Sequence, residues 1–84
     1  MTKEEFLNTM KTWNVASRHY SISEEKKEYA VNLEKISDDL YSVYYLERGV
    51  KIETKNFTKV EDAYDEVARV IKSWIDVGFD VSRF

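Results

Sequence analysis

The segment from Leu40 to Lys55 constrains the fold more than any other part of the chain. Apolar and polar residues alternate on either side of Arg48-Gly49. This alternation is typical of β-strands, and glycine readily adopts the positive φ that a tight mirror-image hairpin turn requires. The pattern therefore predicts a hairpin. Its cross-strand pairs are Tyr45 with Ile52, Val43 with Thr54, and Glu47 with Val50.

This register assigns each side chain of the hairpin to one face of a sheet. One face carries the apolar set Tyr41, Val43, Tyr45, Val50 and Ile52. The opposite face is half apolar on the first strand and charged on the second, and it carries Leu40, Ser42, Tyr44, Leu46, Lys51, Glu53 and Lys55. A slip of one residue would move Val50 and Ile52 to the charged side, so burial is expected to fix the register.

A helix is predicted to open at Thr58. Apolar residues recur there at steps of three and four, namely Val60, Ala63, Tyr64, Val67, Val70, Ile71, Trp74 and Ile75. This spacing is typical of a helix with one buried face. Thr58 and Glu61 have the spacing of a capping box, in which each side chain accepts a hydrogen bond from the other residue's backbone amide. Gly78 is the expected end, because a left-handed residue closes many helices.

The spacing of Thr2 and Glu5 repeats the capping box and predicts a first helix over about Lys3–Asn14. The next apolar segment, Ser17–Ile22, fits either a short edge strand or a loop. Both alternatives stay open from the sequence alone.

The segment from Tyr29 to Ile36 fits the pattern of a helix or of a strand, and we favour the strand. A three-residue turn at Ser37-Asp38-Asp39 would bring it back against the hairpin. The pairs would then be Leu33 with Val43, Val31 with Tyr45, and Tyr29 with Glu47. This pairing places the apolar residues of both strands on the same face, and the helical interpretation offers no comparable agreement.

Together these elements predict a single α+β domain over residues 1–84. The sheet is an antiparallel meander of three or four strands, with an N-terminal and a C-terminal helix packed on one face. This layered arrangement buries the apolar stripe of each element. The tail from Phe79 to Phe84 either packs as an extended segment or frays.

Composition excludes several classes of function. The chain has no cysteine and one histidine, so it has no disulfide, thiol nucleophile or cysteine-ligated metal, and no site that needs two histidines. We recognise no catalytic, cofactor or metal motif, and therefore expect a non-enzymatic protein without a cofactor. No apolar run approaches the roughly 20 residues of a membrane span, so we expect a cytoplasmic protein that binds no membrane. A net charge of -3 argues against nucleic-acid binding.

Two local features have structural explanations that we prefer to chemical ones. Asp38 and Asp39 adjoin, but the neighbouring sequence lacks the spacing of a calcium loop, so we interpret them as a polar turn. His19 is tied to no nucleophile or carboxylate by any motif, and we expect a surface or edge-strand histidine.

The half-apolar face of the sheet is the candidate for partner binding. With both helices on the other side, its centre would be formed by Ala30, Asn32, Tyr44 and Leu46. Charged side chains would flank this centre, namely Glu34, Lys51, Glu53 and Lys55. An apolar centre within a charged rim is typical of a protein-binding surface. A homodimer contact, or incidental surface aromatics, would explain the same pattern.

The segment Tyr41-Ser42-Val43-Tyr44-Tyr45-Leu46-Glu47-Arg48-Gly49 resembles a strand and turn of small immunity proteins encoded beside toxin genes in Gram-positive bacteria. In that family the strand leads through a second strand to a phenylalanine, here Phe57. A helix start follows, here Glu61-Asp62-Ala63, and Tyr20-Ser21-Ile22 matches an upstream short strand. The resemblance extends over about Arg18–Ile71.

The resemblance implies binding to a cognate protein toxin and blockage of its active site. Physical reasoning then suggests Tyr44 and Leu46 as the apolar anchor. If the toxin is a nuclease, acidic side chains would meet its basic cleft, namely Glu34, Glu53, Asp38 and Asp39. Free in solution, the protein would be a monomer or a weak homodimer. The alternative hypothesis is a small phage or regulatory adaptor that acts as a homodimer through the same sheet face.

Overall fold

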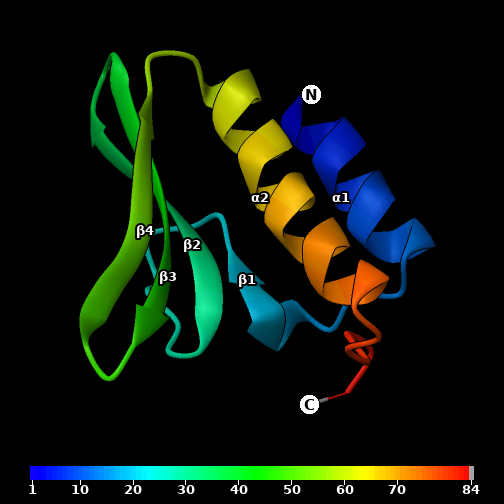
Figure 1. Cartoon of the computed structure of the whole chain (residues 1–84). Helices are drawn as coiled ribbons and strands as arrows, with labels where there is room; N and C mark the ends of the chain where they lie inside the picture. Colours follow the sequence, from blue (N-terminus) through cyan, green and yellow to red (C-terminus); the bar gives the residue numbers. More distant parts are fainter. Residues whose placement is uncertain (84) are drawn as a thin grey trace.

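The computed structural model describes residues 1–83. These residues form two α-helices, four strands and one short 3₁₀-helix (Figure 1). In chain order these elements are α1 Lys3–Thr12, η1 Ser17–His19, β1 Tyr20–Ser21, β2 Ala30–Ser37, β3 Leu40–Glu47, β4 Val50–Phe57 and α2 Val60–Asp76. The prediction of an α+β fold is confirmed.

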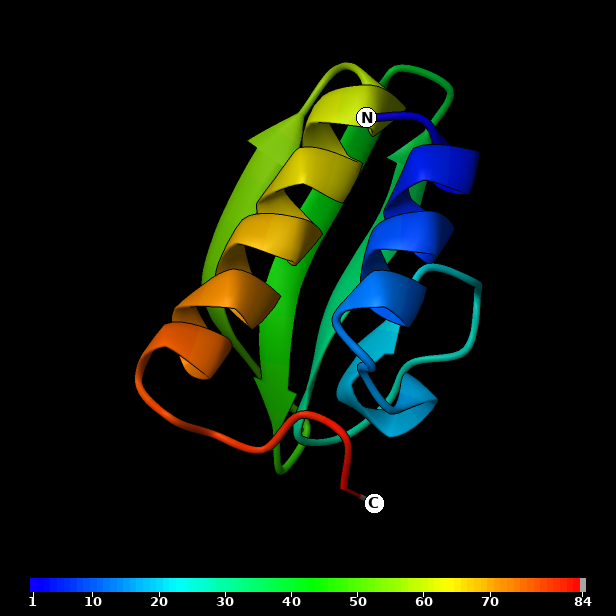
Figure 2. The ribbon, with the colours of Figure 1, turned by 90° about the vertical axis from the view of Figure 1, so that its right-hand side faces the viewer.

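The strands form one open sheet in the order β1-β2-β3-β4. Strands β2, β3 and β4 are an antiparallel meander, whereas β1 runs parallel to β2, with Tyr20 opposite Val31. Both helices cover the same face of the sheet and lie side by side (Figures 1 and 2). The segment Ser17–Ile22 therefore contains a 3₁₀-helix followed by a two-residue edge strand, which combines the two alternatives left open by the sequence.

The predicted pairing of β2 with β3 is confirmed at Val31 with Tyr45 and at Leu33 with Val43. The turn between them differs from the prediction. Ser37 lies opposite Leu40, so the turn has two residues, and the register shifts between Lys35 and Ser37. The extra residue in β2 compensates for the shorter turn, which is why the apolar pairs stay in register.

The hairpin turn at Arg48-Gly49 is confirmed, with φ of 52° and 77° at the two residues. Tyr45 lies opposite Ile52 and Glu47 opposite Val50, as predicted. Beyond these pairs the register shifts, and Val43 lies opposite Lys55 instead of Thr54. Glu53 has a φ of 54°, which marks a β-bulge in β4.

The bulge overturns the predicted face of Lys55. An extra residue in one strand reverses the alternation of every side chain beyond it. Lys55 consequently lies on the helix side of the sheet, where its Nζ is 3.5 Å from Oε2 of Glu66 on α2. Phe57 also turns to this side and packs against the core.

The two predicted capping boxes have different outcomes. The amide of Glu5 donates to Oγ1 of Thr2 at 3.1 Å and the amide of Thr2 donates to Oε1 of Glu5 at 2.7 Å, so the first box is confirmed. The second is wrong, because α2 begins at Val60 after Lys59, which caps it without a side-chain hydrogen bond. At the other end, the prediction for Gly78 is confirmed by its φ of 90°.

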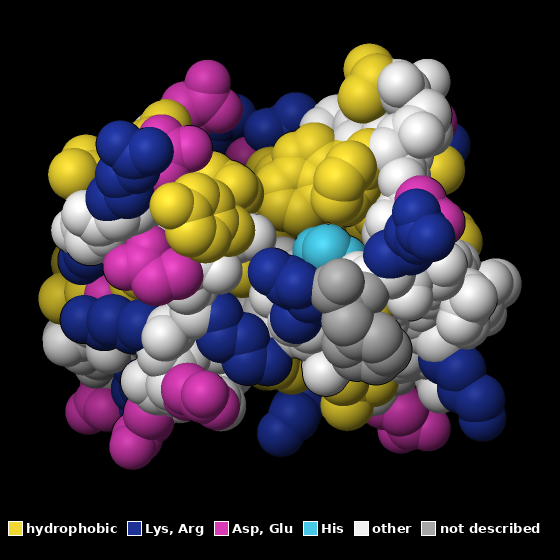
Figure 3. Space-filling model, turned by 90° about the horizontal axis from the view of Figure 1, so that it is seen from below, with side chains coloured by type: hydrophobic (Ala, Val, Ile, Leu, Met, Phe, Trp, Pro, Cys, Tyr) yellow, Lys and Arg dark blue, Asp and Glu magenta, His cyan; other side chains and the backbone are white. Residues whose placement is uncertain are grey.

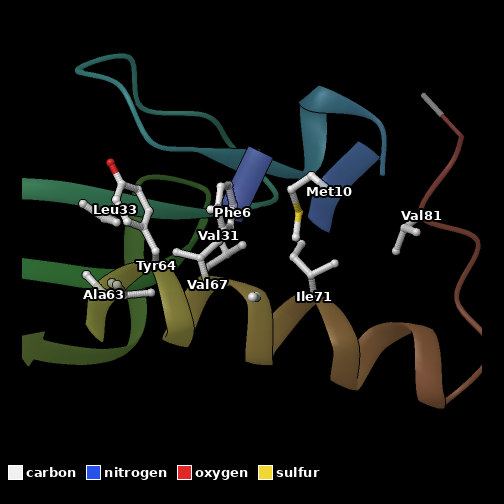
Figure 4. Close-up of a cluster of buried hydrophobic side chains, with 11 residues drawn as sticks. Phe6, Met10, Val31, Leu33, Ala63, Tyr64, Val67, Ile71 and Val81 are labelled. Carbon is white, nitrogen blue, oxygen red and sulfur yellow. The ribbon is translucent and has the colours of Figure 1, made fainter. Parts of the chain in front are cut away.

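One hydrophobic core lies between the helices and the sheet (Figure 4). From α1 it takes Phe6 and Met10, and Met10 points toward Ile71 of α2. The ring of Phe6 stacks on Tyr64 with centroids 5.6 Å apart and contacts Tyr20 edge-on at 5.4 Å. These contacts hold α1, which is too short to be stable by itself in water, against the rest of the fold.

The described part of the tail packs against the segment that follows α1. The amide of Ala16 donates to the carbonyl of Val81 at 2.7 Å, and the side chain of Val81 is buried in the core. His19 Nε2 lies 2.7 Å from the carbonyl oxygen of Arg83. The packed alternative for the tail therefore holds through Arg83, and Phe84 lies outside the described residues. His19 is buried, which corrects the expectation of a surface histidine.

Candidate binding surface

The outer face of the sheet, opposite the helices, is not the exposed surface that the sequence predicts. Tyr44 retains 1% of its accessible surface and Leu46 retains 8%. Ala30 and Asn32 beside them are also buried. The expected apolar anchor of Tyr44 and Leu46 is therefore covered by other parts of the chain, and the prediction of an accessible outer face is wrong.

The connector, which we define as residues 22–29, covers this face. Figure 1 shows it in cyan, crossing to the side of the sheet opposite the helices. Oδ1 of Asn32 accepts from the amide of Lys27 at 2.9 Å, and Nδ2 of Asn32 donates to the carbonyl of the same residue at 3.0 Å. Farther along, a carboxylate oxygen of Glu28 accepts from the amide of Gly49 at 2.9 Å. The connector is thus attached both to β2 and to the hairpin turn.

Tyr44 and Glu34 form the centre of a charged cluster on this face. The hydroxyl of Tyr44 donates to Oε1 of Glu34 at 3.0 Å, and Lys51 and Lys26 lie 3.2 and 3.4 Å from the same carboxylate. Nζ of Lys51 also lies 4.7 Å from the centroid of the Tyr44 ring. Because two ammonium groups flank Glu34, its negative charge is already compensated within the chain, and it is a poor candidate for attracting a basic partner.

Environment shifts the pKa of both members of the pair. Burial, followed by the hydrogen bond to Glu34, raises the pKa of Tyr44 to about 12. For Glu34, burial works against ionisation, but the hydrogen bonds from Lys51 and Tyr44 outweigh it and lower the pKa of the carboxyl. The pair is therefore a neutral phenol that donates to a carboxylate over the physiological pH range.

The raised pKa of Tyr44 predicts a loss of stability at alkaline pH. The neutral phenol is favoured in the folded state, so its contribution is complete below the unfolded pKa of about 10 and falls as the pH rises toward 12. The free energy of unfolding of the wild type, relative to Tyr44→Phe, should fall by about 2 kcal/mol over this range. Urea denaturation at a series of pH values measures it, and a constant difference would contradict the shifted pKa.

The remaining predicted site residues do not come together. Asp38 and Asp39 form the exposed β2–β3 turn, where Lys35 Nζ lies 3.4 Å from Oδ1 of Asp38. In Figure 1 this turn and the β3–β4 turn lie at opposite ends of the sheet. Glu53 lies at the bulge of β4 and lines a hollow on the helix side. The structure thus disperses the acidic surface proposed from the sequence.

The hollow beside Glu53 has a mainly apolar lining and a volume of about 510 Å³. We call it the aromatic groove and define it by Tyr29, Tyr45, Ile52, Trp74, Val77 and Phe79. The ring of Trp74 contacts Tyr45 edge-on at 5.8 Å and Phe79 at 6.2 Å. Figure 3 shows an apolar hollow with the histidine at its edge and basic side chains nearby.

The groove opens at one end into a second hollow of about 520 Å³. The two hollows share Tyr29, Tyr45, Phe79 and His19, so they are parts of one depression. Charged side chains line the second hollow, namely Arg18, Asp80 and Arg83, and we call these three the basic end. Nε of Arg83 is 4.0 Å from Oδ2 of Asp80, and both side chains are largely exposed.

The groove was not predicted from the sequence. Val77 and Phe79 flank the glycine that ends α2, and in the structure they are 82% and 51% exposed. Large apolar side chains that stay exposed beside other aromatics are typical of binding surfaces. Tyr45 was assigned to the buried face, which is the correct side of the sheet, but the end of α2 covers it only in part.

Within the described residues 1–83, no three histidine or acidic side chains gather into a group that could hold a metal ion. None of the helices in this range combines the length and the apolar character needed to cross a membrane. In comparisons with known proteins, no family model, curated protein sequence or solved structure matches the chain.

Proposed function

We propose that this chain is a non-enzymatic immunity protein, which acts in the bacterial cytoplasm by binding a cognate toxin domain and blocking its activity. The observation that carries the proposal is the aromatic groove. Three aromatic rings, Tyr29, Trp74 and Phe79, reach the surface together around one apolar hollow. The resemblance of Tyr41–Gly49 to the strand and turn of immunity proteins supplies the kind of partner.

The groove has the properties expected of a protein-binding surface. Aromatic residues are enriched at the centres of interfaces, where their large area stabilises the complex at a small loss of side-chain entropy. Charged residues border the hollow at both ends, Glu53 at one and Arg18 and Arg83 at the other. An apolar centre with a charged rim matches the general anatomy of such interfaces.

The single histidine also favours a binding role over catalysis. His19 Nε2 is engaged by a backbone carbonyl, and its ring packs edge-on against Phe79 at 5.4 Å. Both contacts position the tail along the groove. The alternative, an adaptor that dimerises through the outer sheet face, requires a surface that the connector covers. For this reason we favour a protein that is monomeric when free.

Co-expression with the toxin domain encoded beside this chain's gene tests the proposal. We expect the wild type to restore growth and Phe79→Ala to lose affinity for the toxin by about 30-fold or more, as for a hot-spot aromatic. Ile36→Ala is the matched control, since Ile36 is a similarly exposed apolar residue outside the groove. Calorimetric titration gives the affinities, and melting temperatures verify that both variants are folded.

Each outcome has one interpretation. If the wild type neither binds nor neutralises the toxin, the immunity proposal is wrong. If Phe79→Ala and Ile36→Ala protect the cells equally and bind with equal affinity, the toxin is bound elsewhere and the groove is not the site.

A further inference from the structure

We infer that the aromatic groove accepts an extended segment of the toxin in which a bulky apolar side chain lies close to an acidic residue. This inference rests on the proposed function and adds the chemistry of the partner. It reverses the sign of the charge expected from the sequence, which pointed to a basic toxin cleft.

The aromatic groove explains why the segment carries a bulky apolar side chain. Its volume of about 510 Å³ falls in the range of sites that enclose a compact ligand. Trp74 forms its centre, with Tyr45 and Phe79 edge-on to it at 5.8 and 6.2 Å. Rings in this arrangement present apolar surface to a further ring or branched aliphatic group, so a large apolar side chain is the expected occupant.

The basic end explains why the segment carries an acidic residue. Arg18 and Arg83 line the same hollow, and among the described residues 1–83 Asp80 is the one carboxylate that lines it, at 4.0 Å from Arg83. The described residues thus place two guanidinium groups against one carboxylate, which gives their side chains a net positive charge at this end. Guanidinium groups bind carboxylates through paired hydrogen bonds, so an aspartate or glutamate fits here better than a basic residue does.

The aromatic groove and the basic end are continuous. One segment can therefore place its apolar side chain in the groove and its acidic residue at the basic end. Tyr29, Tyr45 and Phe79 line both hollows. Glu53 lines the aromatic groove and not the basic end. The depression therefore carries a negative side chain in the groove and positive side chains at the basic end. A bound segment is therefore oriented, with its acidic residue toward Arg18 and Arg83 and away from Glu53.

The acidic side chains that the sequence assigned to a basic toxin cleft do not form a competing surface. Glu34 is held between Lys26 and Lys51. Asp38 is exposed at the β2–β3 turn, at the end of the sheet opposite the β3–β4 turn (Figure 1). Carboxylates that are dispersed or already paired do not act together to attract a basic cleft.

Selection of random displayed peptides on the immobilised protein tests this chemistry without any toxin. We expect the enriched peptides to share a large apolar residue near an aspartate or glutamate. A synthetic peptide of the enriched sequence should bind the double variant Arg18→Glu/Arg83→Glu at least about tenfold more weakly than the wild type. Lys3→Glu is the matched control, because it reverses an exposed charge on α1 and should leave the affinity unchanged.

A second readout locates the bound peptide. The chain has two tryptophans, and only Trp74 lines the groove. With 5-fluorotryptophan incorporated, the ¹⁹F signal of Trp74 should move on addition of the peptide and that of Trp13 should not. Enrichment of basic peptides, absence of any enrichment, or equal affinity for the arginine variant would overturn the inference.

A negative result in the peptide experiment and a negative result in the toxin experiment contradict different proposals. If acidic-apolar peptides bind in the groove but the toxin is not neutralised, the immunity proposal is wrong and the chemistry of the groove stands. If the toxin is neutralised equally by the wild type and by Arg18→Glu/Arg83→Glu, the immunity proposal stands and this inference is wrong.

Discussion

Replacing Tyr44 by alanine is expected to lower the free energy of unfolding by about 3 to 5 kcal/mol, the range for deleting a large buried aromatic side chain. The whole stability of a domain of 84 residues is about 4 to 12 kcal/mol, so the variant should lose between a quarter and nearly all of its stability. Two effects combine, since the cavity removes packing and Glu34 loses the donor that partly compensates its burial. Urea denaturation followed by circular dichroism measures the change.

Two other variants separate these effects. Tyr44→Phe keeps the ring but removes the hydroxyl, and should lower the free energy of unfolding by about 1 to 2 kcal/mol. Tyr29→Ala removes the same side chain from a position that is 47% exposed, so its effect should stay within about 1 kcal/mol. If Tyr44→Ala is no more destabilising than Tyr29→Ala, the outer face is accessible and the connector does not cover it.

The sequence was informative where burial alone decides the structure. The pairs of Val31 with Tyr45 and Leu33 with Val43 were predictable, because any other register would place apolar side chains in water. The turn at Arg48-Gly49 was predictable for a local reason, since glycine accepts the positive φ observed there. Both signals act over a few residues or repeat along a whole strand.

The bulge in β4 shows where such reasoning ends. Glu53 adopts a positive φ although neither glycine nor asparagine marks the position. The shift brings Lys55 next to Glu66 of α2, and it turns Phe57 toward the core between the helices and the sheet. Packing against the helix that follows, not local propensity, therefore decides the register beyond Ile52, and a strand considered by itself cannot reveal it.

The candidate site was mislocated for a related reason. Tyr44 and Leu46 alternate with buried residues, and their exposure depends entirely on what covers the outer face. In the sequence, the connector contains five consecutive charged residues, Glu24–Glu28, and this run does not indicate that the segment packs on the sheet. The groove, in turn, brings together residues from β3, β4, α2 and the tail. No local pattern links Tyr45 to Trp74 and Phe79, so only the tertiary structure assembles them.

Asn32 decides whether the connector stays in place, and Asn32→Ala is the second substitution with a large expected effect. Its side chain is almost fully buried and makes three hydrogen bonds, of which two are to the backbone of Lys27 and one is to the carbonyl of Ala30. Truncation leaves the amide and the carbonyl of Lys27 without these partners. We expect the free energy of unfolding to fall by about 2 to 4 kcal/mol.

The same substitution should also open the connector locally, which a merely global loss of stability would not do. Trypsin cleaves after lysine, and Lys26 and Lys27 lie within the connector. Cleavage at these two residues, followed by mass spectrometry under native conditions, should accelerate in Asn32→Ala more than cleavage at Lys3 or Lys11 on α1. Asn56→Ala is the matched control, because Asn56 is exposed and makes one side-chain hydrogen bond, to Ser42. If both variants are cleaved in the connector at the wild-type rate, contacts other than the Asn32 amide hold the connector over Tyr44.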